Sequence, residues 1–149
     1  MTYDSRPDTY AHIHEVQRLL LTVIQRLQLR SLSHDQSKLY PPEIAIFDEY
    51  TPKLKNMEFG SYEYKENLVE MKPGLDHHYS HNSHHPNFYL DGINGMSLTD
   101  LFEMLCDWMA AVKRQPSGDI HKSIEINTSR YDISDQLKQI LVNTVAELE

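Results

Sequence analysis

The residues from His77 to His85 read His-His-Tyr-Ser-His-Asn-Ser-His-His, and we interpret the rest of the chain as organised around them. The stretch holds five of the nine histidines of the protein. Neutral imidazole is the commonest protein ligand for transition metals, so the stretch predicts a metal site. A solvated polar loop is the alternative interpretation, whereas an expression tag is disfavoured because the run is internal and interrupted. Further candidate ligands elsewhere in the chain would favour the metal site over the polar loop.

Length and composition limit the classes of protein to which the chain can belong. Its 149 residues, 40% of them hydrophobic, suit a single domain spanning residues 1–149. The net charge of -8 disfavours extended nucleic-acid binding, which needs a concentrated basic face. The lone Cys106 cannot form an intramolecular disulfide, and neither a secretory segment nor a membrane-length apolar run is present. We therefore expect a cytoplasmic protein that does not bind membranes.

Apolar residues recur at helical spacing along most of the chain, and no segment reads convincingly as a strand. The pattern therefore predicts an all-α fold. The clearest helical segments cover residues 8–30, 42–51, 62–71, 98–114, 119–126 and 134–148. We expect side-chain caps at Asp8, Ser61, Ser97, Asp119 and Ser134, because their oxygens can accept from the first free backbone N–H groups. Pro73-Gly74 is expected to break the chain between helices.

His12 is the first candidate ligand outside the histidine stretch. At 100° per residue it falls at the edge of the apolar face of helix 8–30, beside Val16 and Val23. The alternative for His12 is a histidine at the edge of the core, satisfied by a backbone carbonyl.

A His-Asp pair follows the first helix. Ser33 and Gln36 form a plausible capping box, which would place His34 and Asp35 at the start of a short helix. Lys38 lies one turn after His34 on the same side, so its ammonium would approach anything bound there. Read alone, Lys38 would be an ordinary surface lysine.

Carboxylates on two further helices are also candidates for binding a metal or for orienting its ligands. Glu43, in a first turn, is most simply explained by the helix dipole, although it could also orient a ligand. Helix 98–114 is apolar nearly all round except for a stripe that includes Glu103, Asp107 and Arg114. Small alanines beside this stripe predict a cavity with Asp107 in its wall. An ion pair between Asp107 and Arg114 is the alternative.

Within the histidine stretch, spacing leaves the choice of ligands open. If residues 75–82 are helical, His77 and His81 are four apart and His78 and His81 are three apart. Either pair could then share a helix face and bind one ion. Pro86 bars further helix, so the two histidines before it are expected in an ordered loop.

The order of these candidates resembles that of the HD-domain superfamily of metal-dependent phosphohydrolases, through His12, the His34-Asp35 pair and Asp107. The Gly-Tyr-Pro signature of the cyclic-dinucleotide branch is missing, so that substrate is not assigned. More closely, the chain looks like a small uncharacterised family found in phages and bacteria. That likeness is carried by residues 34–38, 78–86, 96–97 and 103–111.

The superfamily resemblance implies an HD-domain-like bundle of about five to seven helices around one or two divalent ions. The implied ligands of the first ion are His12, His34, Asp35 and Asp107. Adding His78, His84 and His85 gives a set that suits two ions. Imidazole-rich coordination favours manganese, iron, cobalt, nickel or zinc over magnesium.

The same resemblance implies hydrolysis of a nucleotide or related phosphoester by a metal-activated water. Asp35, Lys38 and Arg114 are the expected catalytic residues, with Lys38 and Arg114 stabilising the phosphate. The substrate would be a small molecule, and the protein could form a homo-oligomer. A di-iron oxygenase of similar fold and a non-catalytic, metal-stabilised interaction protein are the alternatives.

Overall fold

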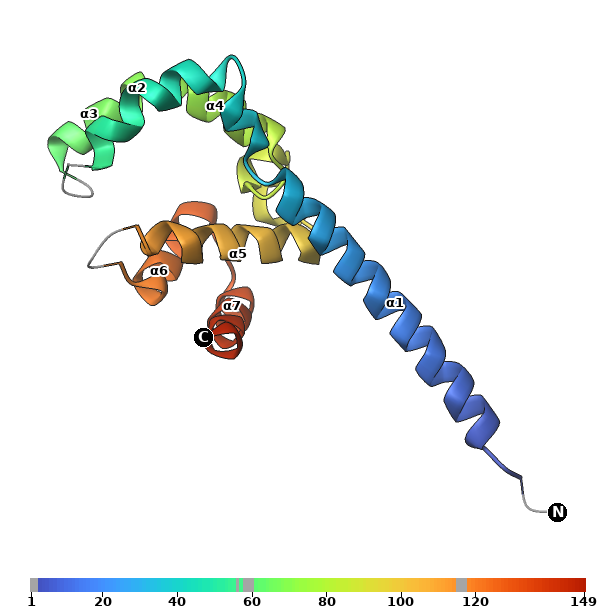
Figure 1. The fold of residues 1–149 in the computed structure, drawn as a ribbon. Coiled ribbons are helices and arrows are strands. Elements are labelled where there is room, and N and C mark those ends of the chain that lie inside the picture. Colours follow the sequence, from blue (N-terminus) through green and yellow to red (C-terminus); the bar gives the residue numbers. More distant parts are fainter. Residues whose placement is uncertain (1–2, 56, 58–60, 115–117) are drawn as a thin grey trace. The chain divides into compact units, whose positions relative to one another are not determined.

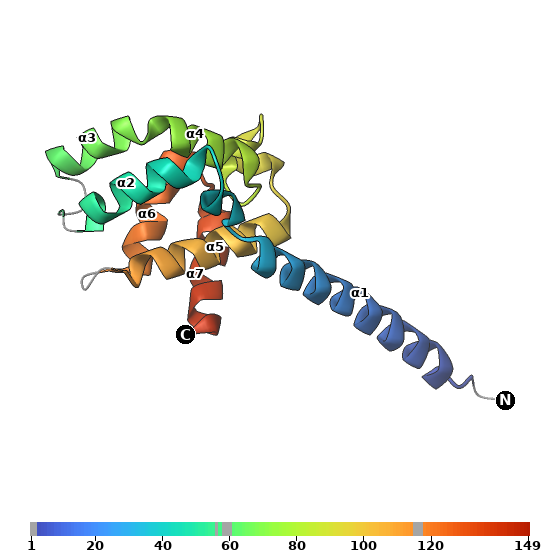
Figure 2. The same ribbon diagram turned by 45° about the horizontal axis from the view of Figure 1, so that its top comes forward.

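The structure is a computed structural model that describes residues 3–55, 57, 61–114 and 118–149. Over these residues it contains seven α-helices, three short 3-10 helices and no strand, which confirms the all-α prediction (Figures 1 and 2). The chain divides into two compact units, Met1–His34 and Asp35–Glu149. A search of the described helices finds none that is both long and apolar enough to span a bilayer.

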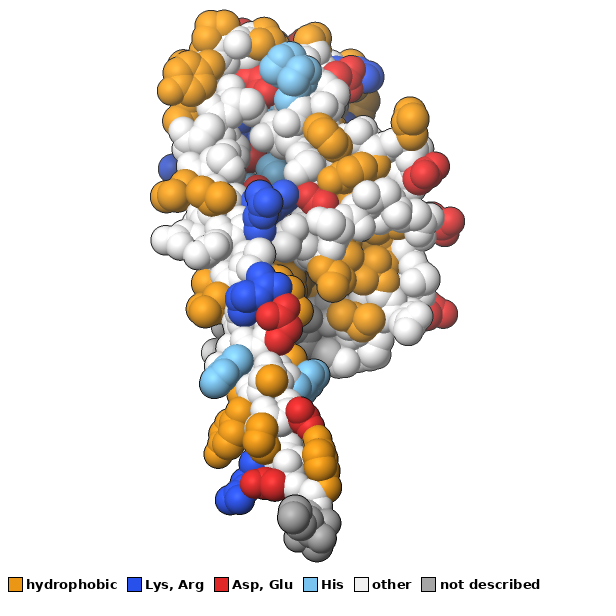
Figure 3. All heavy atoms as spheres, turned by 90° about the vertical axis from the view of Figure 1, so that its right-hand side faces the viewer, with side chains coloured by type: hydrophobic (Ala, Val, Ile, Leu, Met, Phe, Trp, Pro, Cys, Tyr) orange, Lys and Arg blue, Asp and Glu red, His pale blue; other side chains and the backbone are white. Residues whose placement is uncertain are grey.

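The first unit contains one helix, α1 (Arg6–Ser33), as the apolar spacing of residues 8–30 predicts. A proline stands in its first turn, where its missing N–H costs no hydrogen bond. The expected cap at Asp8 is wrong, because Ser5 is the N-cap residue and Asp8 lies in the first turn. Hydrophobic side chains line α1 (Figure 3), and the described part of this unit has no second element to cover them.

The end of α1 differs from the prediction. Ser33 is its last residue and donates its hydroxyl to the carbonyl of Leu29, so it does not form a capping box with Gln36. Asp35 instead adopts a left-handed conformation with φ 57° and ψ 11°. The 3-10 helix η1 (Gln36–Leu39) begins immediately after it. Aspartate tolerates this conformation because its short side chain can form local hydrogen bonds.

Three helices open the second unit: α2 (Glu43–Lys55), α3 (Tyr62–Glu70) and α4 (Lys72–His81). Ser61 caps α3 as predicted, accepting from the N–H of Tyr64. The predicted break between helices is present, but it lies at Met71, two positions before Pro73. Pro73 and Gly74 are already in the first turn of α4, where proline is compatible with a helix. A Cβ on Gly74 would lie 3.0 Å from Cγ2 of Ile46, so glycine lets α4 approach α2 closely.

An ordered loop with two 3-10 helices, η2 (Pro86–Phe88) and η3 (Gly92–Gly95), follows α4. The buried carboxylate of Asp100 holds this loop, accepting hydrogen bonds from Ser83 Oγ at 2.9 Å and Tyr89 Oη at 2.8 Å. The predicted capping box between Ser97 and Asp100 is confirmed. The histidines that precede Pro86 are therefore fixed from the side of the following helix.

The core of the second unit lies among its last three helices, α5 (Leu98–Val112), α6 (Ile120–Tyr131) and α7 (Asp135–Leu148). Asp119 and Ser134 cap α6 and α7 as predicted. The most deeply buried apolar side chains are those of Met104, Leu105, Ile124, Leu141 and Val145. This core supports α5, which carries the carboxylates of Glu103 and Asp107 described below.

Candidate metal centre

Four side chains of the second unit bring one potential ligand atom each to the same place. Asp35 precedes η1, His78 lies in α4, and His84 and His85 lie in the loop that leads to η2. Their ligand atoms all lie within 4.8 Å of one another. Residues far apart in the sequence thus converge, which a solvated polar loop would not require. We call these four residues the buried cluster.

The separations within the buried cluster fit a coordination sphere. Nε2 of His78 lies 3.1 Å and Nε2 of His84 lies 3.4 Å from Oδ1 of Asp35. Donors about 2.1 Å from one ion, at angles between octahedral and tetrahedral, are separated by roughly 3.0–3.4 Å. Nε2 of His85 is also buried and has no hydrogen-bond partner among the described residues. Such a buried nitrogen needs an explanation, and a cation supplies one.

A carboxylate holds the outer nitrogen of two of these imidazoles. Oε2 of Glu43 lies 2.9 Å from Nδ1 of His78, and Oε1 of Glu103 lies 3.1 Å from Nδ1 of His84. An ionised carboxylate only accepts, so each Nδ1 carries a hydrogen. Each Nε2 faces Asp35, with a hydrogen while the ring is charged and with a lone pair that a cation can bind once that proton has left. This carboxylate-imidazole arrangement is the one that orients histidine ligands in metal sites.

Glu43 is fully buried and is fixed by several partners. Besides His78, it accepts hydrogen bonds from Ser37 Oγ at 3.0 Å and from Nδ1 of His77 at 2.7 Å. The amide of Asn82 donates to Ser37 Oγ at 2.9 Å. Glu43 lies in the first turn of α2, as the dipole explanation expects, and its carboxylate also holds the rings of His77 and His78.

Lys38 contacts Asp35 directly. Its Nζ donates to Oδ2 of Asp35 at 2.6 Å and lies 5.1 Å from the centre of the Phe47 ring. The two oxygens of Asp35 are therefore divided, with Oδ2 facing the ammonium and Oδ1 facing the imidazoles. The side chain of Lys38 is 31% exposed, so solvent still reaches it.

The buried cluster shifts the proton affinities of its members. Burial opposes the ionised form of Asp35, but hydrogen bonds from His78 and His84 and the charge of Lys38 hold its pKa well below the usual range. Burial also disfavours the charged form of His84, yet hydrogen bonds to Asp35 and Glu103 raise its pKa to about 9. Burial, then the charges of neighbouring histidines, lowers the pKa of His85 to about 2. A cation would therefore meet one ionised carboxylate and displace a proton from His84.

His12 and His34 belong to the first unit, and the structure contradicts their expected joint binding of one ion. They are 22 positions apart in the sequence, with His12 inside α1 and His34 as its C-cap residue. At 1.5 Å per residue this continuous helix separates them by about 33 Å. One copy of the chain therefore cannot bring both histidines, or His12 and the adjacent Asp35, to the same ion.

The remaining predicted residues lie on α5 or just after it. A carboxylate oxygen of half-buried Asp107 lies within 4.8 Å of one from Asp35, so this aspartate borders the buried cluster. Arg114 is exposed in the turn after α5, seven positions beyond Asp107, or about 10 Å along a helix. The predicted role of Arg114 in binding phosphate thus has no support from a contact with the buried cluster.

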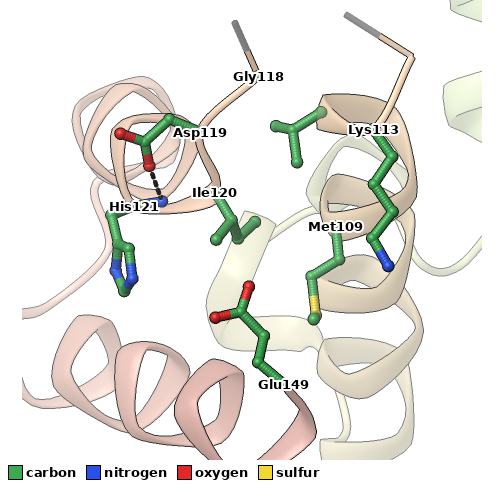
Figure 4. A pocket seen from close by; sticks show the side chains of 8 residues that line it. Met109, Lys113, Gly118, Asp119, Ile120, His121 and Glu149 are labelled. Carbon is green, nitrogen blue, oxygen red and sulfur yellow. Dashed lines mark hydrogen bonds between the residues drawn. The ribbon is translucent and has the colours of Figure 1, made fainter. Parts of the chain in front are cut away.

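A cavity of about 440 Å³ lies at the C-terminal end of α5 (Figure 4). It is lined by Met109, Val112, Lys113, Gly118, Asp119, Ile120, His121 and Glu149. It therefore shares no lining residue with the buried cluster. The prediction of a cavity with Asp107 in its wall is wrong for this cavity. The carboxylate of Asp119 is already used as the cap of α6, where it accepts from the N–H of His121 at 2.8 Å.

Comparison with known protein families identifies the family of this chain. The model of one family matches residues 1–147. The chain belongs to DUF5662, a family of unknown function. No curated protein and no solved structure matches it. The function of this DUF5662 protein is therefore argued from the chemistry of the buried cluster.

Sequence reasoning missed the partner that Glu103 finds in this DUF5662 chain. Glu103 was grouped only with the polar stripe of helix 98–114, although it is four positions before Asp107 and shares its helix face. A carboxylate one turn from a predicted ligand is the signal that could have found it. Its contact with His84 is tertiary, so spacing alone does not reveal which imidazole it orients.

Proposed function

We propose that this DUF5662 protein is a metal-dependent phosphohydrolase that acts on a nucleotide or a related phosphoester. The observation that carries the proposal is the pair of carboxylate-held imidazoles, His78 and His84, whose Nε2 atoms face the same oxygen of Asp35. The resemblance to the HD-domain superfamily supports the same reaction class through the His34-Asp35 pair and Asp107.

The residues that would hold the ion are Asp35, His78, His84 and His85. A divalent cation there would supply a nucleophile from water at neutral pH and polarise a phosphoryl oxygen. Four protein donors complete a tetrahedral zinc site, whereas manganese, iron, cobalt and nickel accept further ligands. We therefore favour one of these four metals for catalysis. Asp107, beside Asp35, is the candidate for holding a second ion.

The charges of the buried cluster suit an anionic substrate. Three neutral imidazoles and one carboxylate leave a divalent ion with one positive charge among its direct ligands, and the partly exposed ammonium of Lys38 adds another. The carboxylates of Glu43 and Glu103 lie behind the imidazoles, at their Nδ1 atoms. Positive charge that is fixed before substrate binds stabilises the charge that develops on a phosphoryl group. Lys38 thus has two functions in the proposal: it holds Oδ2 of Asp35, and it attracts the phosphate.

The test is phosphate release by the full chain after removal of metal and reloading with manganese, iron, cobalt or nickel. We expect activity on part of a panel of nucleoside phosphates and phosphodiesters, and we expect His85→Ala to lose both the bound ion and activity. His121→Ala, which removes an exposed histidine on α6, is the matched control and is expected to remain active. Metal-loaded wild type that cleaves no compound of the panel would contradict the proposal. Oxygen consumption by the iron-loaded protein without phosphate release would favour the oxygenase.

A further inference from the structure

His77 and His81 form an imidazole pair on α4 that does not belong to the buried cluster. They are one helical turn apart, and their rings stack with centroids 3.9 Å apart and planes inclined by 13°. His81 is exposed, and the side chain of His77 is 31% exposed. Solvent and solutes can therefore reach the pair, whereas the side chain of His78 between them in the sequence is only 1% exposed.

Both rings are held through Nδ1. Nδ1 of His77 lies 2.7 Å from Oε1 of Glu43, and Nδ1 of His81 lies 2.7 Å from the backbone carbonyl oxygen of His77. Each partner is an acceptor, so each Nδ1 donates a hydrogen and the lone pair of the neutral ring resides on Nε2. A backbone carbonyl and a carboxylate are the partners that commonly fix the outer nitrogen of metal-binding histidines.

We propose that His77 and His81 form a second, solvent-accessible binding site for a divalent transition-metal ion such as Ni²⁺, Cu²⁺ or Zn²⁺. Histidines at positions i and i+4 share a helix face and can bind one ion together, and imidazole suits these metals. Because the Nε2 lone pair lies in the plane of its ring, binding requires the two rings to turn out of the present stack until both planes meet at the ion. Water completes the coordination, because the pair faces solvent. The inference concerns ion binding alone and does not depend on the phosphohydrolase proposal.

Glu43 joins the surface pair to the buried cluster. Its Oε1 holds His77 and its Oε2 holds His78, so a single buried carboxylate orients one ligand of each site. Glu43 is therefore unsuitable for separating the two sites by mutation. His81 is suitable, because it is exposed and does not touch Glu43 in any described contact.

The test counts Ni²⁺ ions bound by the metal-free full chain in equilibrium dialysis. We expect His81→Ala to bind one ion fewer than wild type and His121→Ala to bind as many as wild type. His85→Ala is expected to lose a different ion, so that the variant with both changes loses two. Circular dichroism checks that each variant keeps its helix content, and His81→Gln repeats the test with a larger side chain.

A second measurement identifies the ligands directly. In His85→Ala, where the buried cluster is expected to bind no ion, substoichiometric Ni²⁺ is expected to broaden the imidazole proton resonances of His77 and His81, and to leave His77 sharp when His81→Ala is added. The inference is overturned if His81→Ala and His81→Gln bind as many ions as wild type with unchanged affinity. It is equally overturned if His77 stays sharp in His85→Ala while Ni²⁺ binds elsewhere.

Discussion

Metal binding by the buried cluster is expected to release a proton from His84, so the apparent affinity should rise with pH into the alkaline range. Burial lowers the pKa of His84, but hydrogen bonds to Asp35 and Glu103 outweigh burial and raise it to about 9. A cation can bind Nε2 only after that proton leaves. Below pH 9 the association constant is therefore expected to rise about tenfold per pH unit, lying about 100-fold below its plateau at pH 7.

The decisive window is about pH 7.5 to 8.5, because a histidine with an ordinary pKa near 6.5 is already neutral there. Chelator-buffered titrations with Ni²⁺ in the His81→Ala background measure the affinity, and calorimetry in two buffers of different ionisation enthalpy counts the protons released. Glu103→Ala removes one of the contacts that raise the pKa of His84, so the plateau is expected to begin at lower pH. An affinity that is constant across the window, with no proton released, would refute the reasoning.

Three further substitutions test the outer contacts and the packing. Above pH 9, where the proton no longer competes, Glu103→Ala is expected to weaken metal binding by about 10–100-fold, whereas the exposed Glu63→Ala has no effect; equal losses in both would contradict the orienting role. Gly95→Ala places a Cβ 2.7 Å from Cβ of Tyr89. Urea denaturation is therefore expected to show a free energy of unfolding lower by about 1–3 kcal/mol. An unchanged midpoint would argue against this close approach. Ile124→Ala removes a fully buried side chain of the core and is expected to lower the free energy of unfolding by about 2–5 kcal/mol in the same assay. A change near zero would contradict the burial of Ile124.

Local signals predicted most of the helices because a cap and its partner are close in sequence. Ser61, Ser97 and Ser134 accept from backbone N–H groups three positions later, which spacing alone identifies. Two of the errors in helix bounds arose at prolines. Pro73 lies in a first turn where no hydrogen bond is lost, and α2 continues through Pro52, so neither residue ends a helix.

The ligands of the buried cluster were predictable by residue type, but their partners were not. Asp35, His78, His84 and His85 were all named from the sequence, whereas the contact of Glu43 with His78 joins two helices and depends on tertiary packing. The expected use of His12 ignored a local signal: no glycine or proline interrupts residues 12–33, so α1 continues and carries His12 away from His34.

An anomalous-difference map from crystals of the manganese-loaded protein, recorded on both sides of the metal's absorption edge, tests the central claim most directly. The predicted result is a peak about 2.0–2.3 Å from Nε2 of His78, His84 and His85 and from Oδ1 of Asp35. Ordered imidazoles with no peak between them, or manganese bound only elsewhere on the chain, would contradict the assignment of the buried cluster as a metal centre.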